Sequence, residues 1–180
     1  MFSFLRKTLD LRLCTAVAGL LLATVFCFWW YGSPKRVNEA MREITEIVDG
    51  IHKDYVRKNS YWGVNNSALE SNKRLRHRGS QTVNAFGKPI LVGQGENGDT
   101  VMPGDRTFDI VFTELSFGEC VRSATTSFAS PETLGLMQVK IIGKSEQVFI
   151  WGNKEYNLPL PEFQAKEFCD KDSKVIWTFE

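Results

Sequence analysis

The chain has 180 residues, with 22 Lys or Arg against 21 Asp or Glu, so its formal net charge is +1. Proteins whose main partner is nucleic acid carry a strong basic field, and this balance therefore predicts no nucleic-acid partner. About 150 residues follow the apolar N-terminal segment, which is enough for one domain with its own core.

The apolar segment spans residues 13–31 and holds no charged residue over those 19 positions. At about 1.5 Å per residue, such a helix nearly crosses a hydrocarbon layer of roughly 30 Å. Trp29, Trp30 and Tyr31 end it, and such rings favour a membrane–water interface. The segment is longer than the apolar part of a signal peptide and lacks its small-residue cleavage pattern. We therefore expect a retained anchor with the N-terminus inside.

Four cysteines fall into two pairs. Cys14 and Cys27 lie inside the apolar segment, where they act as small apolar residues. Cys120 and Cys169 lie in the remainder, and we expect them to form a disulfide if that part is outside the cytoplasm. The bond would close a loop of roughly 50 residues and contribute about 4 kcal/mol. Two unpaired core thiols are the alternative.

Residues 34–58 predict an amphipathic helix, because apolar residues recur there in steps of three and four. The apolar positions are Val37, Met41, Ile44, Ile47, Val48, Ile51 and Tyr55. The charged positions, expected on the other faces, are Glu39, Arg42, Glu43, Glu46, Lys53 and Arg57. Joined to the apolar segment, this helix gives two expected parts: residues 1–32 as a membrane or filament-core helix, and residues 33–180 as a globular domain.

Residues 59–82 are polar and irregular, with a short helix expected over residues 67–75. They contain one basic run: Lys73, Arg74, Arg76, His77 and Arg78. Such a run is usually a solvated loop face, and contact with an acidic partner or a polyanion is the alternative.

Strand patterns dominate from residue 83 onward. The expected strands are residues 88–92, 107–115, 137–142, 147–151 and 175–179, with a short helix over residues 119–126 and a loop at residues 159–161. The predicted fold class is α+β: a long N-terminal helix, half in the membrane and half amphipathic, packs on an antiparallel sheet of four to six strands. Cys169 would tie the last strand back to the segment after residue 115.

No group of residues in the sequence suits catalysis. Residues 93–98 match G-x-G-x-x-G, but residues 99–104 cannot open the helix that a dinucleotide site requires, so a turn is expected. His52 and His77 lack zinc-ligand spacing, and no C-x-x-C occurs. Asp99, Asp105 and Asp109 lack the close spacing of a calcium loop. We therefore predict a protein that is not an enzyme and needs no cofactor or metal.

One further pattern is a possible modification site. Residues 65–67, Asn-Asn-Ser, form a glycosylation sequon. It matters only in a compartment that glycosylates proteins.

Several segments together resemble type IV pilins, in particular the type IVb group. They are the apolar helix running into an amphipathic one, the turn at residues 83–90, the strand from residue 107 that leads to Cys120-Val121, and Cys169 followed by the strand at residues 175–179. The resemblance implies a pilus subunit whose N-terminal helix packs with those of other subunits. It also implies an acidic residue near the start of that helix, a place that Asp10 could take.

Two functions stay open. The first is a structural subunit of a type IV pilus-like filament or its assembly machinery, located in a bacterial inner membrane with its domain in the periplasm, or in a surface pilus. Its partners would be itself or other pilin-like subunits, together with the inner membrane. The alternative is a single-pass, membrane-anchored binding component of another envelope or secretion complex. It fits the absence of a Gly directly before the apolar run, since pilin leaders usually end in one.

Overall fold

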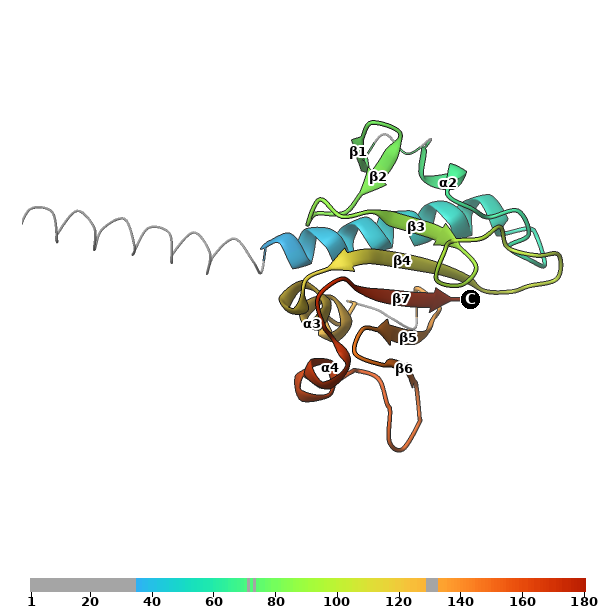
Figure 1. Ribbon diagram of the computed structural model, residues 1–180. Helices are drawn as coiled ribbons and strands as arrows, with labels where there is room; N and C mark the ends of the chain where they lie inside the picture. The colour runs from blue at the N-terminus through green and yellow to red at the C-terminus, as the bar shows by residue number, and fades with distance from the viewer. Residues whose placement is uncertain (1–34, 71, 73, 129–132) are drawn as a thin grey trace, which may run out of the picture. The chain divides into compact units, whose positions relative to one another are not determined.

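The computed structural model describes residues 35–70, 72, 74–128 and 133–180. A helix over residues 35–55, which we call the N-terminal helix, comes first. The elements that follow it in Figure 1 are α2 (Ser67–Glu70), β1 (Arg76–Arg78), β2 (Gln81–Val83), β3 (Ile90–Gly93), β4 (Phe108–Leu115), α3 (Phe117–Thr125), β5 (Leu136–Ile142), β6 (Glu146–Ile150), α4 (Glu162–Phe168) and β7 (Ser173–Phe179).

Five strands form one antiparallel sheet in the order β3-β4-β7-β5-β6. The last strand of the chain therefore lies in the middle, with β4 on one side and β5 on the other. Ile110 of β4 and Val139 of β5 are both paired with Trp177 of β7. The predicted antiparallel sheet of four to six strands is confirmed. The sheet is complete only when β7, which directly precedes Glu180, has paired with both of its neighbours.

One face of the sheet carries the core. Because side chains alternate along a strand, the register places Phe112, Trp177 and Ile141 on the same face, and all three are buried. The rings of Phe112 and Trp177 meet edge to face with centroids 4.9 Å apart. Such aromatic pairs add to the stabilisation that burial alone provides.

The N-terminal helix packs against this face, as Figure 1 shows. Its buried stripe consists of Val37, Ala40, Met41, Ile44, Ile47, Val48 and Ile51, which confirms the predicted apolar positions apart from Tyr55, which is half-buried. The prediction of the charged positions is wrong for Glu43, which was expected on an exposed face but is only 4% exposed. Glu43 stands three residues after Ala40 and four before Ile47, a spacing that places it on the apolar stripe.

The segment between the helix and the sheet departs most from the prediction. The helix expected over residues 67–75 has four residues, α2, and β1 with β2 form a hairpin where only a loop was expected. Gly79, at φ +66°, allows the tight turn between those two strands. Part of the basic run is therefore the strand β1, all of whose side chains are exposed. The sequence did not predict this strand, because a short strand of exposed charged residues shows no hydrophobic alternation.

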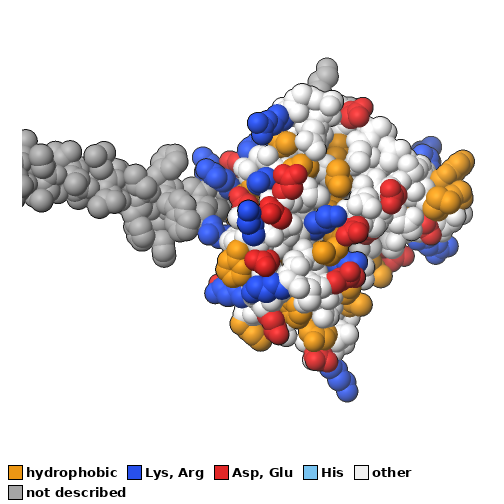
Figure 2. Space-filling view, in the orientation of Figure 1, with side chains coloured by type: hydrophobic (Ala, Val, Ile, Leu, Met, Phe, Trp, Pro, Cys, Tyr) orange, Lys and Arg blue, Asp and Glu red, His pale blue; other side chains and the backbone are white. Residues whose placement is uncertain are grey.

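The C-terminal half follows the prediction with one addition. The strands β4, β5, β6 and β7 and the helix α3 lie within two residues of the expected bounds. The helix α4 was not predicted; it begins directly after Pro161, at the end of the expected loop. Figure 2 shows Lys or Arg and Asp or Glu side chains interspersed over the visible face of the domain, in keeping with the balanced composition.

Candidate functional site

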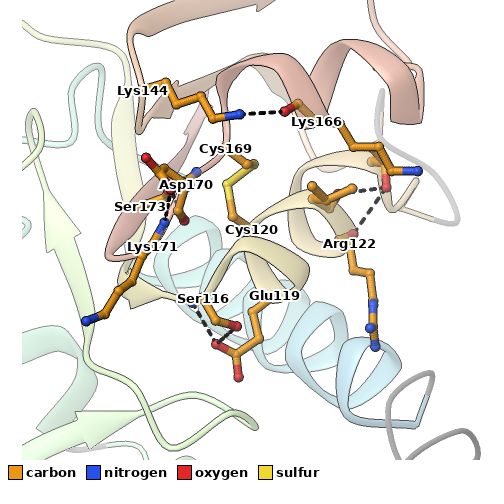
Figure 3. The surroundings of a disulfide bond; sticks show 12 residues. Ser116, Glu119, Cys120, Arg122, Lys144, Lys166, Cys169, Asp170, Lys171 and Ser173 are labelled. Atoms are coloured by element: carbon orange, nitrogen blue, oxygen red, sulfur yellow. Dashed lines mark hydrogen bonds between the residues drawn. A yellow bond between two sulfur atoms is a disulfide. The ribbon is translucent and has the colours of Figure 1, made fainter.

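The disulfide joins the two short helices of the C-terminal half. Cys120 lies in α3 and Cys169 directly follows α4, and their sulfur atoms are 2.00 Å apart. Both residues are fully buried. Figure 3 shows the bond between the two helices, at the C-terminal end of α4. The predicted Cys120–Cys169 disulfide is thus present, and it closes the loop that carries β5, β6 and α4.

Hydrogen bonds fix both partners of the disulfide in place (Figure 3). The Glu119 carboxylate accepts from the backbone N–H and the hydroxyl of Ser116 at 2.9 and 2.8 Å, which holds the start of α3. The Ser173 hydroxyl accepts from the Asp170 N–H at 2.7 Å and donates to its carbonyl oxygen at 2.8 Å. The chain between Cys169 and β7 is therefore a tight turn, and it sets the position where the last strand enters the sheet.

The turn between β5 and β6 docks on the same helices. The Lys144 backbone N–H donates to the Phe168 carbonyl oxygen at 2.9 Å, and the Lys144 side chain reaches the Lys166 carbonyl oxygen at 3.4 Å. A Cβ atom on Gly143 would stand 2.4 Å from the Phe168 oxygen. Only glycine fits at this close approach. We call α3, α4 and this turn, residues 143–145, the disulfide lobe.

The disulfide lobe exposes two aromatic rings. Phe163 on α4 is 71% exposed, and Phe117 at the start of α3 is also exposed. The Lys144 ammonium lies 5.8 Å from the centre of the Phe117 ring. A rigid, cross-linked surface with exposed aromatic side chains suits contact with another protein, since aromatic residues are enriched in the buried cores of interfaces.

A buried carboxylate holds the turn that precedes β3. Glu43 of the N-terminal helix accepts from the Ala85 N–H at 2.9 Å, and its second oxygen lies 3.6 Å from the Arg76 guanidinium. Arg76 also binds Glu39 at 2.6 Å. Burial raises the pKa of Glu43 from its ordinary 4.5 to about 7, although Arg76 and the Ala85 N–H both act to lower it. These contacts tie the β1–β2 hairpin and the following turn to the helix.

The turn itself has the local structure that its sequence favours. The buried Asn84 side chain accepts from the backbone N–H groups of Phe86 and Lys88 at 2.9 and 3.1 Å. Gly87 has φ +76°, which a glycine adopts without strain. The turn at residues 83–90 was singled out from the sequence, whereas Glu43 was expected on the charged face of the helix. Its place on the apolar stripe was the signal that could have identified it as buried.

The residues considered for other chemistry have structural roles. The predicted turn at residues 93–98 is confirmed, with paired hydrogen bonds between Gln94 and Asp99 at 2.7 and 3.0 Å. Asp105 accepts from the Gln94 side chain, and Asp109 accepts from the Gly95 N–H and the Thr178 hydroxyl. Within the described ranges, no cluster of three or more His, Cys, Asp or Glu could hold a metal ion.

The two histidines and the sequon also take part in local structure. His52 packs its ring against Tyr61 and Phe108, and burial lowers its pKa below the ordinary 6.5. His77 is within 3.3 Å of the Thr82 hydroxyl. The Asn65 side chain of the sequon accepts from the Ser67 N–H at 2.9 Å, at the start of α2.

The predicted assembly residue Asp10 and the predicted anchor at residues 13–31 lie outside the described residues. Among the helices that the structure describes, none is long and apolar enough to cross a membrane.

The fold was compared with those of known proteins. No protein-family model matches the sequence, and no curated protein sequence matches it. Among solved structures, the chain is similar to TcpA, a type IV pilin from Vibrio cholerae El Tor biotype, with a TM-score of 0.54 and 12% identity over 81% of this chain and 99% of that one. A type IVb pilin from Salmonella typhi gives a TM-score of 0.49 and 14% identity over 80% and 97% of the two chains. The N-terminal helix, the five-stranded antiparallel sheet and the Cys120–Cys169 disulfide therefore make up a type IV pilin fold.

Proposed function

We propose that the protein is a structural subunit of a type IV pilus-like filament or of the machinery that assembles one. The observation that carries the proposal is the fold: the similarity to TcpA extends over 99% of that pilin and includes the helix-on-sheet core. The role is structural, and no catalytic step forms part of it.

Assembly would proceed through the apolar N-terminal helix, residues 1–32, with residues 33–180 as the globular domain on the surface. Apolar burial between neighbouring helices would supply the cohesion. Asp10 would set the register by pairing with a positive group, since an unpaired charge is costly in such surroundings. Before assembly, the same helix would hold the subunit in the inner membrane with its domain in the periplasm.

The disulfide lobe offers a lateral contact for the globular domain. Phe163 and Phe117 expose aromatic surface on a part of the chain that the Cys120–Cys169 bond keeps rigid. A neighbouring subunit would bury these rings when the filament forms. Preorganisation by the disulfide lowers the entropy cost of that contact.

The alternative is a single-pass, membrane-anchored binding component of another envelope or secretion complex. One observation favours it: no Gly directly precedes the apolar run, so the leader cleavage that usually releases a pilin into a filament lacks its usual site. In that role the globular domain would bind a partner while the N-terminal segment stays in the membrane.

The test compares the wild type with Asp10→Ala and with a matched control, Asp54→Ala, whose side chain is exposed on the N-terminal helix. Each full-length protein is expressed in its own organism, and sheared surface filaments and inner membranes are probed for it. Intact mass of the protein in each fraction shows whether a leader has been removed.

The filament proposal expects the wild type and Asp54→Ala in the sheared fraction, and Asp10→Ala reduced there but retained in the membrane. Equal recovery of Asp10→Ala in filaments would remove the role of Asp10. A full-length protein that stays in the inner membrane and co-purifies with envelope partners would support the alternative.

A further inference from the structure

Three large apolar side chains are exposed where the N-terminal helix ends. Val56 is 78% exposed, Trp62 is 64% exposed and Met102 is 61% exposed. Figure 2 shows hydrophobic side chains gathered at the right-hand end of the domain, with Lys and Arg side chains beside them. We call Val56, Trp62 and Met102 the apolar tip. Single exposed apolar residues are common on protein surfaces, but a group of them calls for an explanation.

The apolar tip stands on a braced backbone. The Ser60 hydroxyl oxygen accepts from the N–H groups of Trp62 and Gly104, both at 3.1 Å, and so joins the two loops that carry the tip. The Gly63 N–H donates to the Val101 carbonyl oxygen at 3.0 Å, one residue from Trp62 and Met102 respectively. These bonds hold the backbone of the two loops together, and the Trp62 and Met102 side chains are exposed on it.

The helix and the loops are linked as well. The Tyr55 hydroxyl donates to the Trp62 carbonyl oxygen at 3.3 Å, which ties the end of the N-terminal helix, directly before Val56, to the Trp62 loop. The Tyr61 N–H donates to the Asp105 carbonyl oxygen at 3.0 Å. Two segments distant in sequence, residues 55–63 and 101–105, are thus joined at the end of the domain that carries the three exposed apolar residues.

Basic side chains lie beside the apolar tip. Arg57 and Lys58 follow Val56 directly and are exposed. A groove of about 490 Å³ beside the tip is lined by Lys58 and Arg106 and by a single acid, Glu180. Acidic residues lie close by as well. Asp49 acts electrostatically on His52 of this groove, and the Asp105 carboxylate accepts a hydrogen bond from Gln94.

We propose that the apolar tip inserts into the headgroup layer of an anionic lipid bilayer, with Arg57, Lys58 and Arg106 against the lipid phosphates. A bilayer surface suits these features better than a protein partner does. Three side chains on projecting loops supply far less than the roughly 800 Å² per partner of a stable protein interface. Tryptophan favours the membrane–water interface, and apolar insertion combined with basic residues is how proteins bind anionic lipid surfaces.

This inference stands apart from the proposed filament. The tip and its cations belong to the globular domain, so the bilayer contact can be measured whether or not the protein enters a pilus. Different variants test the two proposals: Asp10→Ala tests filament assembly, and Trp62→Ser tests the bilayer contact.

The test uses full-length protein held in uncharged phosphatidylcholine nanodiscs, which shield the apolar N-terminal segment. Capture by sedimenting vesicles is measured for two lipid compositions: phosphatidylcholine alone, and phosphatidylcholine with about 30% phosphatidylglycerol, roughly the charge density of an anionic membrane. The variants are Trp62→Ser and Met102→Ser. The matched control is Ile150→Ser, which removes an exposed apolar side chain from the edge strand β6.

The expected result is capture of the wild type and Ile150→Ser by anionic vesicles. Capture should be about tenfold weaker for Trp62→Ser, and weaker also for Met102→Ser, because the apolar area that enters the bilayer is lost. Added salt should weaken capture of the wild type. Equal capture of Trp62→Ser and the wild type would overturn the proposal, as would equal binding to uncharged vesicles. A third outcome would also overturn the proposal: no vesicle capture, but association between nanodiscs that carry the protein, which Trp62→Ser abolishes. It would show that the apolar tip binds a second copy of the chain and not a bilayer. Intact Cys120–Cys169 bonds and unchanged thermal unfolding show that each variant has folded.

Discussion

Replacing Glu43 by Gln tests how a buried carboxylate on the N-terminal helix affects stability. The Glu43 side chain lies between the helix and the turn before β3, where it accepts from the Ala85 N–H and faces Arg76. Gln keeps the shape and an oxygen acceptor for Ala85, but it cannot ionise. The comparison therefore isolates the free energy of placing a charge at this position.

The sign follows from the direction of the pKa shift. A carboxyl whose pKa is raised in the folded state binds its proton more tightly there, so its contribution favours folding below the unfolded value near 4.5 and is lost as the pH rises through about 7. The rise of the pKa from 4.5 to about 7 corresponds to a free energy of about 3 kcal/mol, at roughly 1.4 kcal/mol per pKa unit. Most of this, about 2–3 kcal/mol, falls between pH 5 and pH 8.

The assay is urea unfolding of the full-length protein in mild detergent, followed by circular dichroism at pH 5 and pH 8. Relative to the wild type, Glu43→Gln should gain about 2–3 kcal/mol in free energy of unfolding between the two pH values. The control is Glu46→Gln, which removes a helix-surface ion pair with Arg42 worth a few tenths of a kcal/mol. A difference between Glu43→Gln and the wild type that stays constant from pH 5 to pH 8 would show that Arg76 keeps Glu43 ionised throughout, and the burial argument would fail.

Three more predictions concern the core and the disulfide. Replacing Cys120 and Cys169 together by Ser should lower the free energy of unfolding by about 4 kcal/mol, and reductant should then have no further effect on the urea midpoint; an unchanged midpoint would deny the disulfide its stabilising role. Gly50→Ala should raise the free energy of unfolding by about 0.5–1 kcal/mol, since the new methyl group on the helix meets no atom within 4 Å. Gly143→Ala should lower the melting temperature, because its Cβ would clash with α4. A destabilised Gly50→Ala together with a stabilised Gly143→Ala would refute this reasoning. Trp177→Ala should cost about 3–5 kcal/mol, read from the same urea curves, because the ring is fully buried; a loss below about 1 kcal/mol would mean that the core closes around the gap.

Local periodicity was enough to predict most of the elements. The apolar steps from Val37 to Ile51 gave the N-terminal helix, and partial alternation gave β4 to within one residue. The strand pattern at residues 175–179 gave β7 to within two. The pairing of Cys120 with Cys169 followed from the expected compartment and from there being two cysteines in the domain. These are properties that neighbouring residues, or a simple count, express without knowledge of the rest of the fold.

The tertiary structure alone decided the rest. The burial of Glu43 depends on the Ala85 N–H and on Arg76, which come from segments more than thirty residues away. The position of β7 between β4 and β5 depends on a register that no local pattern contains. The apolar tip exists because Ser60 joins two loops whose residues are 44 positions apart in the chain. Sequence patterns report what a side chain prefers, whereas burial, strand order and surface clustering depend on which distant segments meet, and only the packed chain settles that.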